Sequence, residues 1–191
     1  MAEFVLASQS PRRKQLLEWA ELEFEIITEP TDESYPGGLE PKDVALYIAR
    51  DKAEAVKHKI KNQTVIAADT IVVLNGEIIG KPKDRADAIS ILNKLRGNCH
   101  QVITGVAIVG IEKAIYFSDT TDVEFHPLTL EQISFYVDKY KPYDKAGAYA
   151  IQEWIGVTGI KRINGDFYNV MGLPVSRVIQ ALQELSGGKG K

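Results

Sequence analysis

Three long apolar runs constrain the fold of this chain more than any other feature of its sequence. They are TVIAADTIVVL at residues 64–74, HQVITGVAIVGI at residues 100–111 and AIYFSDTTDVEF at residues 114–125. Runs of this composition predict extended strands, and the last two predict a hairpin. Together with strand–helix units elsewhere, they predict an α/β fold with a mixed sheet flanked by helices.

Shorter patterns complete the predicted order of elements. The first helix has Ser10 as its N-cap and Pro11 as its first residue, as expected for a helix start. Asn75-Gly76 predicts a tight turn, and Asn164-Gly165 predicts a second hairpin over residues 157–172. Further strands are expected at residues 3–7, 24–27 and 77–80, and helices at 11–20, 41–62, 85–95, 129–140 and 174–185.

The composition limits the classes of function. The chain has 191 residues and a net charge of −3, so no general field attracts nucleic acid or an anionic membrane. Its single cysteine, Cys99, excludes an intramolecular disulfide and suits a reducing compartment. No apolar run approaches the roughly 18 residues of a membrane span, and no secretory leader is apparent. We expect a cytoplasmic protein folded over residues 1–185, with a disordered tail at residues 186–191.

Standard catalytic motifs are absent from the sequence. It contains no phosphate-binding P-loop, dinucleotide-binding glycine motif, zinc-protease motif or serine-hydrolase elbow. The histidines His58, His100 and His126 lie far apart, and we expect structural or surface roles for them. Any chemistry must therefore come from charged residues that lie where packing alone would not place them.

The first such place is the segment SQSPRRK at residues 8–14. A helix N-terminus already carries positive potential, so cations there are electrostatically unfavourable unless an anion binds. Arg12 and Arg13 offer forked donors that suit phosphate, beside the free amides of the first turn. Helical spacing also places at least one of the two arginines toward the core. A solvated basic turn is the alternative.

Lys52 is the second candidate because it interrupts an apolar helical stripe. Ala45, Ala49, Lys52 and Val56 fall on one helical face. The lysine either binds an anion or extends its ammonium past apolar neighbours into water.

Asp69 is the strongest single candidate. In a strand, the nearest residues on its face are apolar, among them Ala67 and Ile71. A carboxylate there needs a cation, a metal ion or hydrogen-bond donors. We therefore consider it a candidate general base; a bulge or strand end that turns the acid to water is the alternative.

Two further charged residues complete the set. Lys81 follows a strand and a glycine and precedes a proline, which presents an amine rigidly at a sheet edge. Glu33 lies in the turn-rich segment of residues 28–41. Several cations with two or three acids match the requirements of a triphosphate with a divalent metal ion.

With these residues in place, the sequence resembles the Maf family, also called septum-formation inhibitor proteins, which are nucleoside triphosphate pyrophosphatases. The resemblance extends over nearly the whole chain. It rests on the segments LASQSPRRKQLL, ARDKA, AADTIV, GKP, HQVITGV, DKAGAYAIQ and INGDFYNVMGLPV, in that order. It implies two lobes about a substrate cleft, a relation to the inosine triphosphate pyrophosphatases, and hydrolysis of a nucleotide to its monophosphate and diphosphate with Mg or Mn.

The resemblance also implies roles for individual residues. Asp69 matches the proton acceptor, with Glu33 as metal ligand and Asp69 as a possible second ligand. The cations Arg13, Lys52 and Lys81 match groups that contact the triphosphate, and Ser8 lies where its hydroxyl or amide can contact phosphate. The family's positions for substrate choice match Arg12, Thr70 and Gln152. A homodimer is a reasonable expectation on the same basis.

Gln152 predicts the substrate. Within the family, the branch that acts on 7-methyl-GTP has an acidic residue at this position, whereas a neutral amide suits the uncharged base of dTTP or UTP. We therefore predict hydrolysis of dTTP and UTP, with modified pyrimidine nucleotides as further candidates. Glu153 and Trp154 depart from many relatives, which have glycine after the glutamine. A slip of one residue would bring Glu153 to the base and favour 7-methyl-GTP.

A regulator of cell division, or a nucleotide-sensing protein with incidental hydrolysis, is the alternative from another class. An acidic chain that lacks basic stripes interleaved with aromatic residues is poorly equipped to bind nucleic acid.

Overall fold

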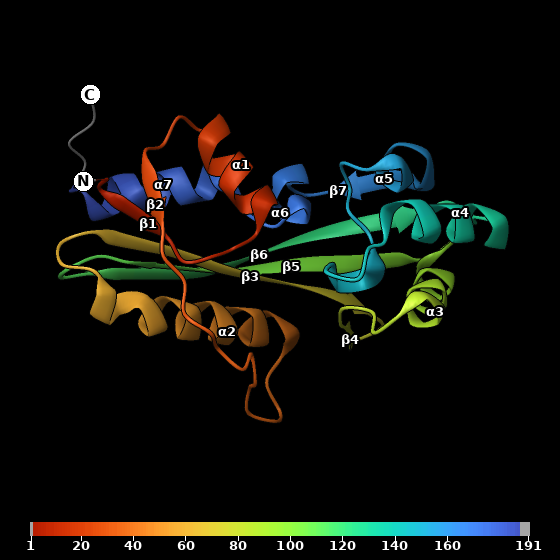
Figure 1. Ribbon diagram of the computed structural model, residues 1–191, viewed down its shortest axis with the longest axis horizontal. Helices are drawn as coiled ribbons and strands as arrows, with labels where there is room; N and C mark the ends of the chain where they lie inside the picture. Colours follow the sequence, from red (N-terminus) through yellow and green to blue (C-terminus); the bar gives the residue numbers. More distant parts are fainter. Residues whose placement is uncertain (1, 188–191) are drawn as a thin grey trace. The chain divides into compact units, whose positions relative to one another are not determined.

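The computed structural model of the protein describes residues 2–187 (Figure 1). Strands and helices alternate along the chain, as the sequence predicts. In order, the elements are β1 (Phe4–Leu6), α1 (Pro11–Trp19), β2 (Phe24–Ile26), α2 (Pro41–Val56), the 3-10 helix η1 (Lys57–Lys59), β3 (Thr64–Leu74), β4 (Glu77–Ile79), α3 (Arg85–Leu95), β5 (Cys99–Val109), β6 (Ala114–Phe125), α4 (Leu130–Tyr140), the 3-10 helix η2 (Ala146–Ala148), α5 (Trp154–Gly159), β7 (Ile160–Asn164), α6 (Phe167–Met171) and α7 (Val175–Leu185).

The strands form one mixed sheet. Their order is β2-β1-β3-β5-β6-β7, and β4 pairs with β3 beside this path. β1 is parallel to both β2 and β3, whereas β4 and β7 run antiparallel to β3 and β6, respectively. The predicted α/β class with a mixed sheet flanked by helices is therefore confirmed.

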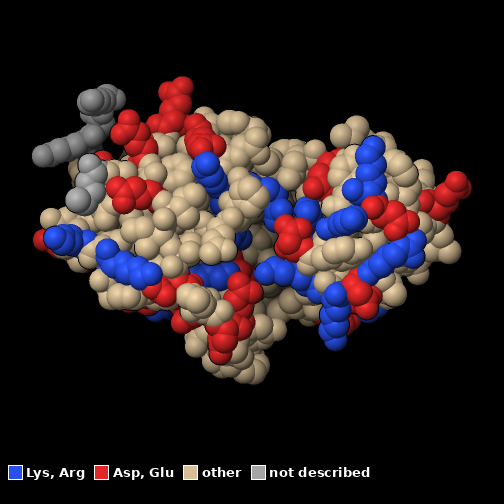
Figure 2. Space-filling view, in the orientation of Figure 1, with Lys and Arg blue, Asp and Glu red and all other residues tan. Residues whose placement is uncertain are grey.

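The surface carries both signs of charge. Figure 2 shows Lys and Arg side chains interspersed with Asp and Glu over the face that it draws. No helix among residues 2–187 combines the length and the apolarity that crossing a membrane requires.

The chain divides into two compact units, and unit 1 contains the residues up to Asp69, Thr104–Asp119 and the residues from Gly172 onward. Within unit 1, α2 covers one face of the sheet, and α1 and α7 cover the other (Figure 1).

Small residues bring α2 close to the sheet. A Cβ atom on Gly105 of β5 would lie 2.3 Å from the backbone carbonyl carbon of Ala45, so only glycine permits this packing. The buried residues of this interface are Ala7, Ala49, Ala53, Val56, Val65, Ala67, Ala107 and Val109.

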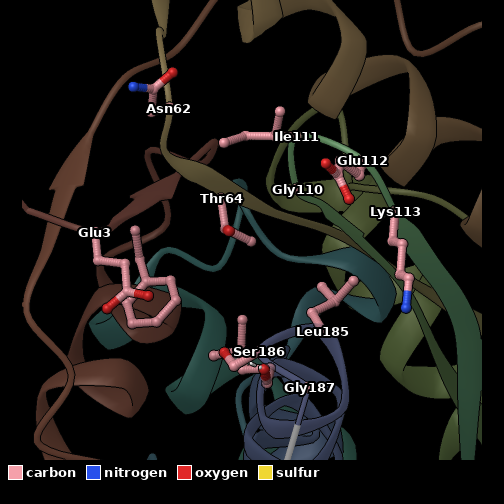
Figure 3. A pocket seen from close by; sticks show the side chains of 12 residues that line it. Glu3, Asn62, Thr64, Gly110, Ile111, Glu112, Lys113, Leu185, Ser186 and Gly187 are labelled. Atoms are coloured by element: carbon pink, nitrogen blue, oxygen red, sulfur yellow. Dashed lines mark hydrogen bonds between the residues drawn. The ribbon is translucent and has the colours of Figure 1, made fainter. Parts of the chain in front are cut away.

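Unit 1 also has a surface pocket of about 420 Å3 near the starts of β1 and β3 (Figure 3). Leu185 of α7 and the charged residues Glu112 and Lys113 of the β5–β6 turn are among its lining residues. None of the site residues predicted from the sequence lines it.

Unit 2 contains Thr70–Ile103 and Thr120–Met171. Its core lies where α3 packs against α4 and η2. The largest fully buried side chains of this core include Leu92, Leu95, Phe125, Ile133 and Tyr136. The arrangement of two lobes about a cleft stays a prediction.

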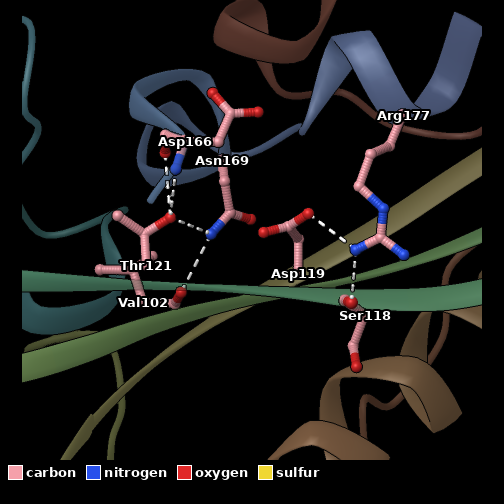
Figure 4. Close-up of polar contacts among 7 residues, drawn as sticks. All are labelled: Val102, Ser118, Asp119, Thr121, Asp166, Asn169 and Arg177. Atoms are coloured by element: carbon pink, nitrogen blue, oxygen red, sulfur yellow. Dashed lines mark hydrogen bonds and ion pairs between the residues drawn. The ribbon is translucent and has the colours of Figure 1, made fainter. Parts of the chain in front are cut away.

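The hairpin predicted over residues 157–172 is wrong. The segment instead forms the end of α5, then β7 and α6. A type I′ turn needs positive φ at both central residues, and here Gly165 has a φ of +130° while Asn164 ends β7. A polar cluster explains the change, because the Asp166 N–H and Asn169 Nδ2 donate to Thr121 Oγ1 at 3.1 and 3.0 Å (Figure 4). These bonds fold the chain over β6 into α6.

The helix predicted at residues 41–62 is too long. It ends at Val56, where the Lys57 N–H bonds to the Glu54 carbonyl and η1 begins. The sequence loses its apolar period after Val56, and Ile60 is already extended toward β3. At the other end of the chain, Ser186 and Gly187 form a turn after α7, and the rest of the predicted disordered tail lies outside the described residues.

Candidate functional site

The turn between β1 and α1 forms one side of the candidate site in unit 1. Ser10 caps α1, its hydroxyl accepting the Arg13 N–H at 3.5 Å, and Pro11 begins the helix. The Ser8 hydroxyl accepts hydrogen bonds from the Ser10 N–H and from Arg13 Nη1, both at 3.2 Å. The first turn of α1 contains no acidic residue, so its positive potential is available to an anion.

Arg13 is the buried cation that the sequence predicts at this helix start. Its side chain is only 9% exposed, and its Nε donates to the Gly172 carbonyl at 2.8 Å. Burial lowers the pKa of the guanidinium; the negative charges of Asp69 and Glu33 oppose this shift, and the neighbouring Arg12 adds to it. Because an arginine stays protonated in proteins, this is a fixed positive charge held in one orientation.

Lys52 contributes the second cation, from the apolar stripe of α2. Its Nζ lies 2.7 Å from Asp69 Oδ1 and 2.6 Å from Glu33 Oε1, and its side chain is 16% exposed. The ammonium therefore joins a helix, a strand and a loop. The alternative in which it simply reaches into water is wrong, since two carboxylates bind it.

Asp69 occupies the position on β3 that the sequence singled out. Its side chain is 13% exposed, and Lys52 supplies the cation that such a carboxylate needs. β1 pairs with β3 only as far as the Leu6↔Ile66 register. Beyond Ile66, β1 turns away toward Ser8, which leaves the Asp69 segment of β3 unpaired with β1.

A local turn positions Glu33 in the irregular segment before α2. The Asp32 carboxylate accepts hydrogen bonds from the Ser34 N–H and the Ser34 hydroxyl, both at 2.9 Å. These bonds lower the pKa of Asp32, the backbone bond most. The turn holds Glu33 at a φ of +54°, a left-handed conformation that costs a non-glycine residue about 1 kcal/mol. Its ion pair with Lys52 offsets this cost.

The remaining predicted residues, Thr70, Lys81 and Gln152, belong to unit 2. The segment that carries Gln152 packs beside Gly80 and β3, since the Gly147 N–H donates to the Gly80 carbonyl at 3.1 Å. A Cβ on Gly147, whose φ is +69°, would lie 2.8 Å from a methyl group of Val72. These contacts fix the Gln152 segment next to the residue before Lys81 and near Thr70 of β3.

Sequence reasoning singled out Glu153 beside Gln152 but missed Tyr136 and Lys145, the two polar residues that contact it. The Tyr136 hydroxyl donates to Glu153 Oε2, and Lys145 Nζ lies 3.7 Å from Glu153 Oε1. Lys145 is 8% exposed. The only signal in the sequence for Lys145 was its place in the segment DKAGAYA, in which small and aromatic residues follow the pair Asp144-Lys145.

The carboxylates of the site fit a divalent metal ion in part. No group of three or more His, Cys, Asp or Glu side chains within residues 2–187 is arranged as a metal site. Glu33 and Asp69, however, both reach the same ammonium. Two carboxylates supplemented by phosphate oxygens and water are the usual ligands of Mg2+ in nucleotide sites, so these residues are suitable donors once a triphosphate is bound.

Unit 1 thus provides an α/β fold with two partly buried cations, two carboxylates and a helix N-terminus, as in proteins that bind phosphate groups. Comparison with known proteins specifies the family. Residues 3–185 match the family model described as Maf-like protein. The chain belongs to the Maf family, which confirms the resemblance seen in its sequence.

Individual relatives are similar over almost the full chain. The dTTP/UTP pyrophosphatase of Cytophaga hutchinsonii is 50% identical over 96% of this chain and 84% of its own length. The dTTP/UTP pyrophosphatase of Parabacteroides distasonis is 49% identical over 94% of both chains. Among solved structures, the Staphylococcus aureus Ham1 protein is 22% identical over 96% of this chain and 98% of that chain, with a TM-score of 0.48. The relation to inosine triphosphate pyrophosphatases stays a prediction.

His100 supports the segment before Gln152 and makes stability depend on pH. It is 1% exposed, and its Nε2 lies 2.7 Å from the Tyr149 hydroxyl. Burial lowers the pKa of His100 to about 4 from an ordinary 6.5. Because the unfolded chain takes up this proton at the higher pH, the stabilising contribution is complete above pH 6.5 and is lost as the pH falls toward 4.

We therefore expect the free energy of unfolding to fall by up to about 3 kcal/mol on this account across that pH range. Urea unfolding at a series of pH values measures it. His100→Gln should reduce the pH dependence, and His126→Gln, at an exposed position, should keep it. Equal pH dependence in both variants would contradict the assignment to His100.

Proposed function

We propose that the protein is a nucleoside triphosphate pyrophosphatase. It hydrolyses dTTP and UTP to the nucleoside monophosphate and inorganic diphosphate (pyrophosphate). The observation that carries this proposal is the Lys52 ammonium, shared by Asp69 and Glu33 in the unit that also holds Arg13 and Ser8. The names of the relatives from Cytophaga hutchinsonii and Parabacteroides distasonis support the same reaction and substrates.

The cations bind the triphosphate. Arg13 is held by Ser8 and the Gly172 carbonyl, so the direction of its guanidinium is fixed. Lys52 is a compact charge whose partners can change, because phosphate oxygens compete with carboxylates for an ammonium. Lys81 adds a further cation to the triphosphate, and together these groups stabilise negative charge on the departing diphosphate.

Asp69 is the proton acceptor. A water molecule attacks the α-phosphorus, its proton passes to the Asp69 carboxylate, and the bond from the α-phosphorus to the bridging oxygen of the diphosphate breaks. Before reaction, the Lys52 ammonium is paired with the Asp69 carboxylate at 2.7 Å. When phosphate oxygens replace the carboxylate as partners of Lys52, the Asp69 carboxylate can instead accept a hydrogen bond from the attacking water.

Glu33 and Asp69 are the proposed ligands of Mg or Mn. The metal ion would neutralise phosphate charge and orient the triphosphate. Glu33 is suited to this role because its side chain is 41% exposed and contacts the same ammonium as Asp69. The hydrogen bond from the Ser34 N–H to Asp32 holds the turn that carries it.

Gln152 selects the base, with Thr70 and Arg12 as the other residues for substrate choice. An amide offers one donor and one acceptor, which match the O4 and N3–H edge of thymine and uracil. An uncharged amide does not attract the positively charged ring of 7-methyl-GTP as a carboxylate would. We therefore place 7-methyl-GTP second to dTTP and UTP as a substrate. Clearing modified pyrimidine nucleotides is a further proposed use of the same site.

A catalytic role accounts for these features better than a regulatory one. A regulator that bound nucleic acid would need an open basic face, whereas Arg13 and Lys52 are largely buried beside carboxylates. The cytoplasmic location and the homodimer stay predictions.

Asp69→Asn tests the proton acceptor. The amide cannot accept a proton, so kcat should fall by about 10²-fold or more while dTTP binding is largely retained. Diphosphate release and calorimetric binding measure the two effects. Near-normal turnover would remove Asp69 from this role, and orthophosphate as the product of the unmutated protein would overturn the reaction class.

Lys52→Met tests the shared ammonium. Its loss removes a phosphate contact and the partner of two carboxylates, so kcat/KM for dTTP should fall by about 10²-fold or more. Lys57→Met is the matched control on the same stretch of chain, because Lys57 pairs only loosely with Glu54 at 3.4 Å and both side chains are more than half exposed. Similar small effects in the two variants would contradict the proposed role of Lys52.

A panel of nucleoside triphosphates tests the choice of base. The unmutated protein should prefer dTTP and UTP over purine nucleotides, and Gln152→Glu should shift the preference toward 7-methyl-GTP, because a carboxylate attracts the positively charged base. The ratios of kcat/KM measure this preference. If 7-methyl-GTP were the best substrate of the unmutated protein, the assignment of Gln152 would be wrong.

A further inference from the structure

Gln152 lies within a tight turn in unit 2. The Glu153 N–H donates to the Ala150 carbonyl at 3.1 Å, which closes a four-residue turn in which Gln152 is the third residue. Ile151 is buried at 4% exposure, whereas the Gln152 side chain is exposed. The turn therefore anchors itself through Ile151 and presents Gln152.

One buried hydroxyl holds both ends of this turn. Tyr136 of α4 is fully buried, and its oxygen accepts the Ala150 N–H at 3.2 Å. The same hydroxyl donates its proton to Glu153 Oε2. Tyr136 thus contacts the residues on either side of Ile151 and Gln152, and a hydrogen bond to an ionised acceptor is among the stronger ones in proteins.

Both carboxylate oxygens of Glu153 contact neighbouring side chains. Its second carboxylate oxygen lies 3.7 Å from Lys145 Nζ, and this lysine also lies 2.7 Å from Asp144 Oδ1. The side chain of Glu153 is 20% exposed. The ammonium and the tyrosine hydroxyl together account for both carboxylate oxygens.

The next helix presses against the same turn. A Cβ on Gly156 of α5 would lie 1.7 Å from the Ile151 carbonyl oxygen, so the backbones of α5 and the turn are in direct contact. The Gly156 N–H also donates to the Glu153 carbonyl at 2.9 Å. Contact on this side prevents the turn from moving toward α5, which leaves its orientation to be fixed by Tyr136.

We propose that Tyr136 and Glu153 are positioning residues for base recognition. Their hydrogen bond fixes the orientation in which Gln152 meets the base, and Glu153 itself does not contact the base. This inference rests on the proposed function, because it takes Gln152 as the residue that reads a pyrimidine. It also selects between the two registers of the sequence, in favour of Gln152.

Tyr136→Phe removes only the hydroxyl and tests this positioning role. The turn keeps its backbone bond but loses its fixed orientation, so KM for dTTP should rise about tenfold while kcat changes less than about twofold. Hydrolysis of 2-deoxyribose 5-triphosphate, which lacks the base, should keep its unmutated kinetics. Tyr140→Phe is the matched control, since Tyr140 stacks on Tyr136 in the same helix with ring centroids 5.0 Å apart.

Glu153→Gln tests the second part of the proposal. The new amide keeps an oxygen that accepts the Tyr136 proton, so the preference for dTTP over 7-methyl-GTP should stay within about threefold of the unmutated value. A large change in this preference would mean that Glu153 itself reads the base, and would overturn the assignment.

Two other outcomes are distinguishable. Equal losses on dTTP and on the substrate without a base, or equal effects of Tyr136→Phe and Tyr140→Phe, would show a general structural effect and overturn the positioning role while the proposed function stands. Failure of the unmutated protein to release diphosphate from any nucleoside triphosphate would instead overturn the proposed function, and this inference with it.

Discussion

The ammonium of Lys52 is the interaction on which the candidate site depends. It joins α2 to Asp69 of β3 and to Glu33 of the irregular segment before the helix. Without a cation between them, the two carboxylates would repel each other in a partly buried setting. Glu33 would then lack the contact that offsets its left-handed backbone. One charge thus links three segments.

The two cations of unit 1 differ in how freely they can exchange partners. Arg13 is buried and held by a carbonyl and a hydroxyl, so its direction is fixed by the fold. Lys52 is paired with two carboxylates, and both of these also suit a metal ion. Under the proposed function, a triphosphate with its metal would take over both sides of the Lys52 ion pairs, so that no buried charge would be left uncompensated.

The sequence predicted those features in which a residue conflicts with its surroundings. Lys52 on an apolar stripe and Asp69 in an apolar strand each needed a partner, and the structure pairs them with each other. Arg13 contacts Ser8 and the Gly172 carbonyl, and the anion expected beside it stays a prediction. The hairpin at Asn164-Gly165 could not be excluded because its turn signal is local, whereas the contacts that override it come from Thr121, more than forty positions away in the chain. The hydrogen bonds from Tyr136 to the turn that contains Gln152 could not be predicted for the same reason, because Tyr136 lies on another helix.

The close packing of α2 on the sheet has a mechanical consequence. Its interface consists largely of alanine, valine and glycine, and at Gly105 the strand meets the helix backbone directly. Alanine has no side-chain rotamers, valine is strongly restricted at χ1, and backbones in contact cannot approach further. The helix therefore has little room to slide or tilt on the strands. This packing consequently fixes the separation between the Lys52 and Asp69 backbones, and rearrangements of long side chains elsewhere in the core should leave that separation unchanged.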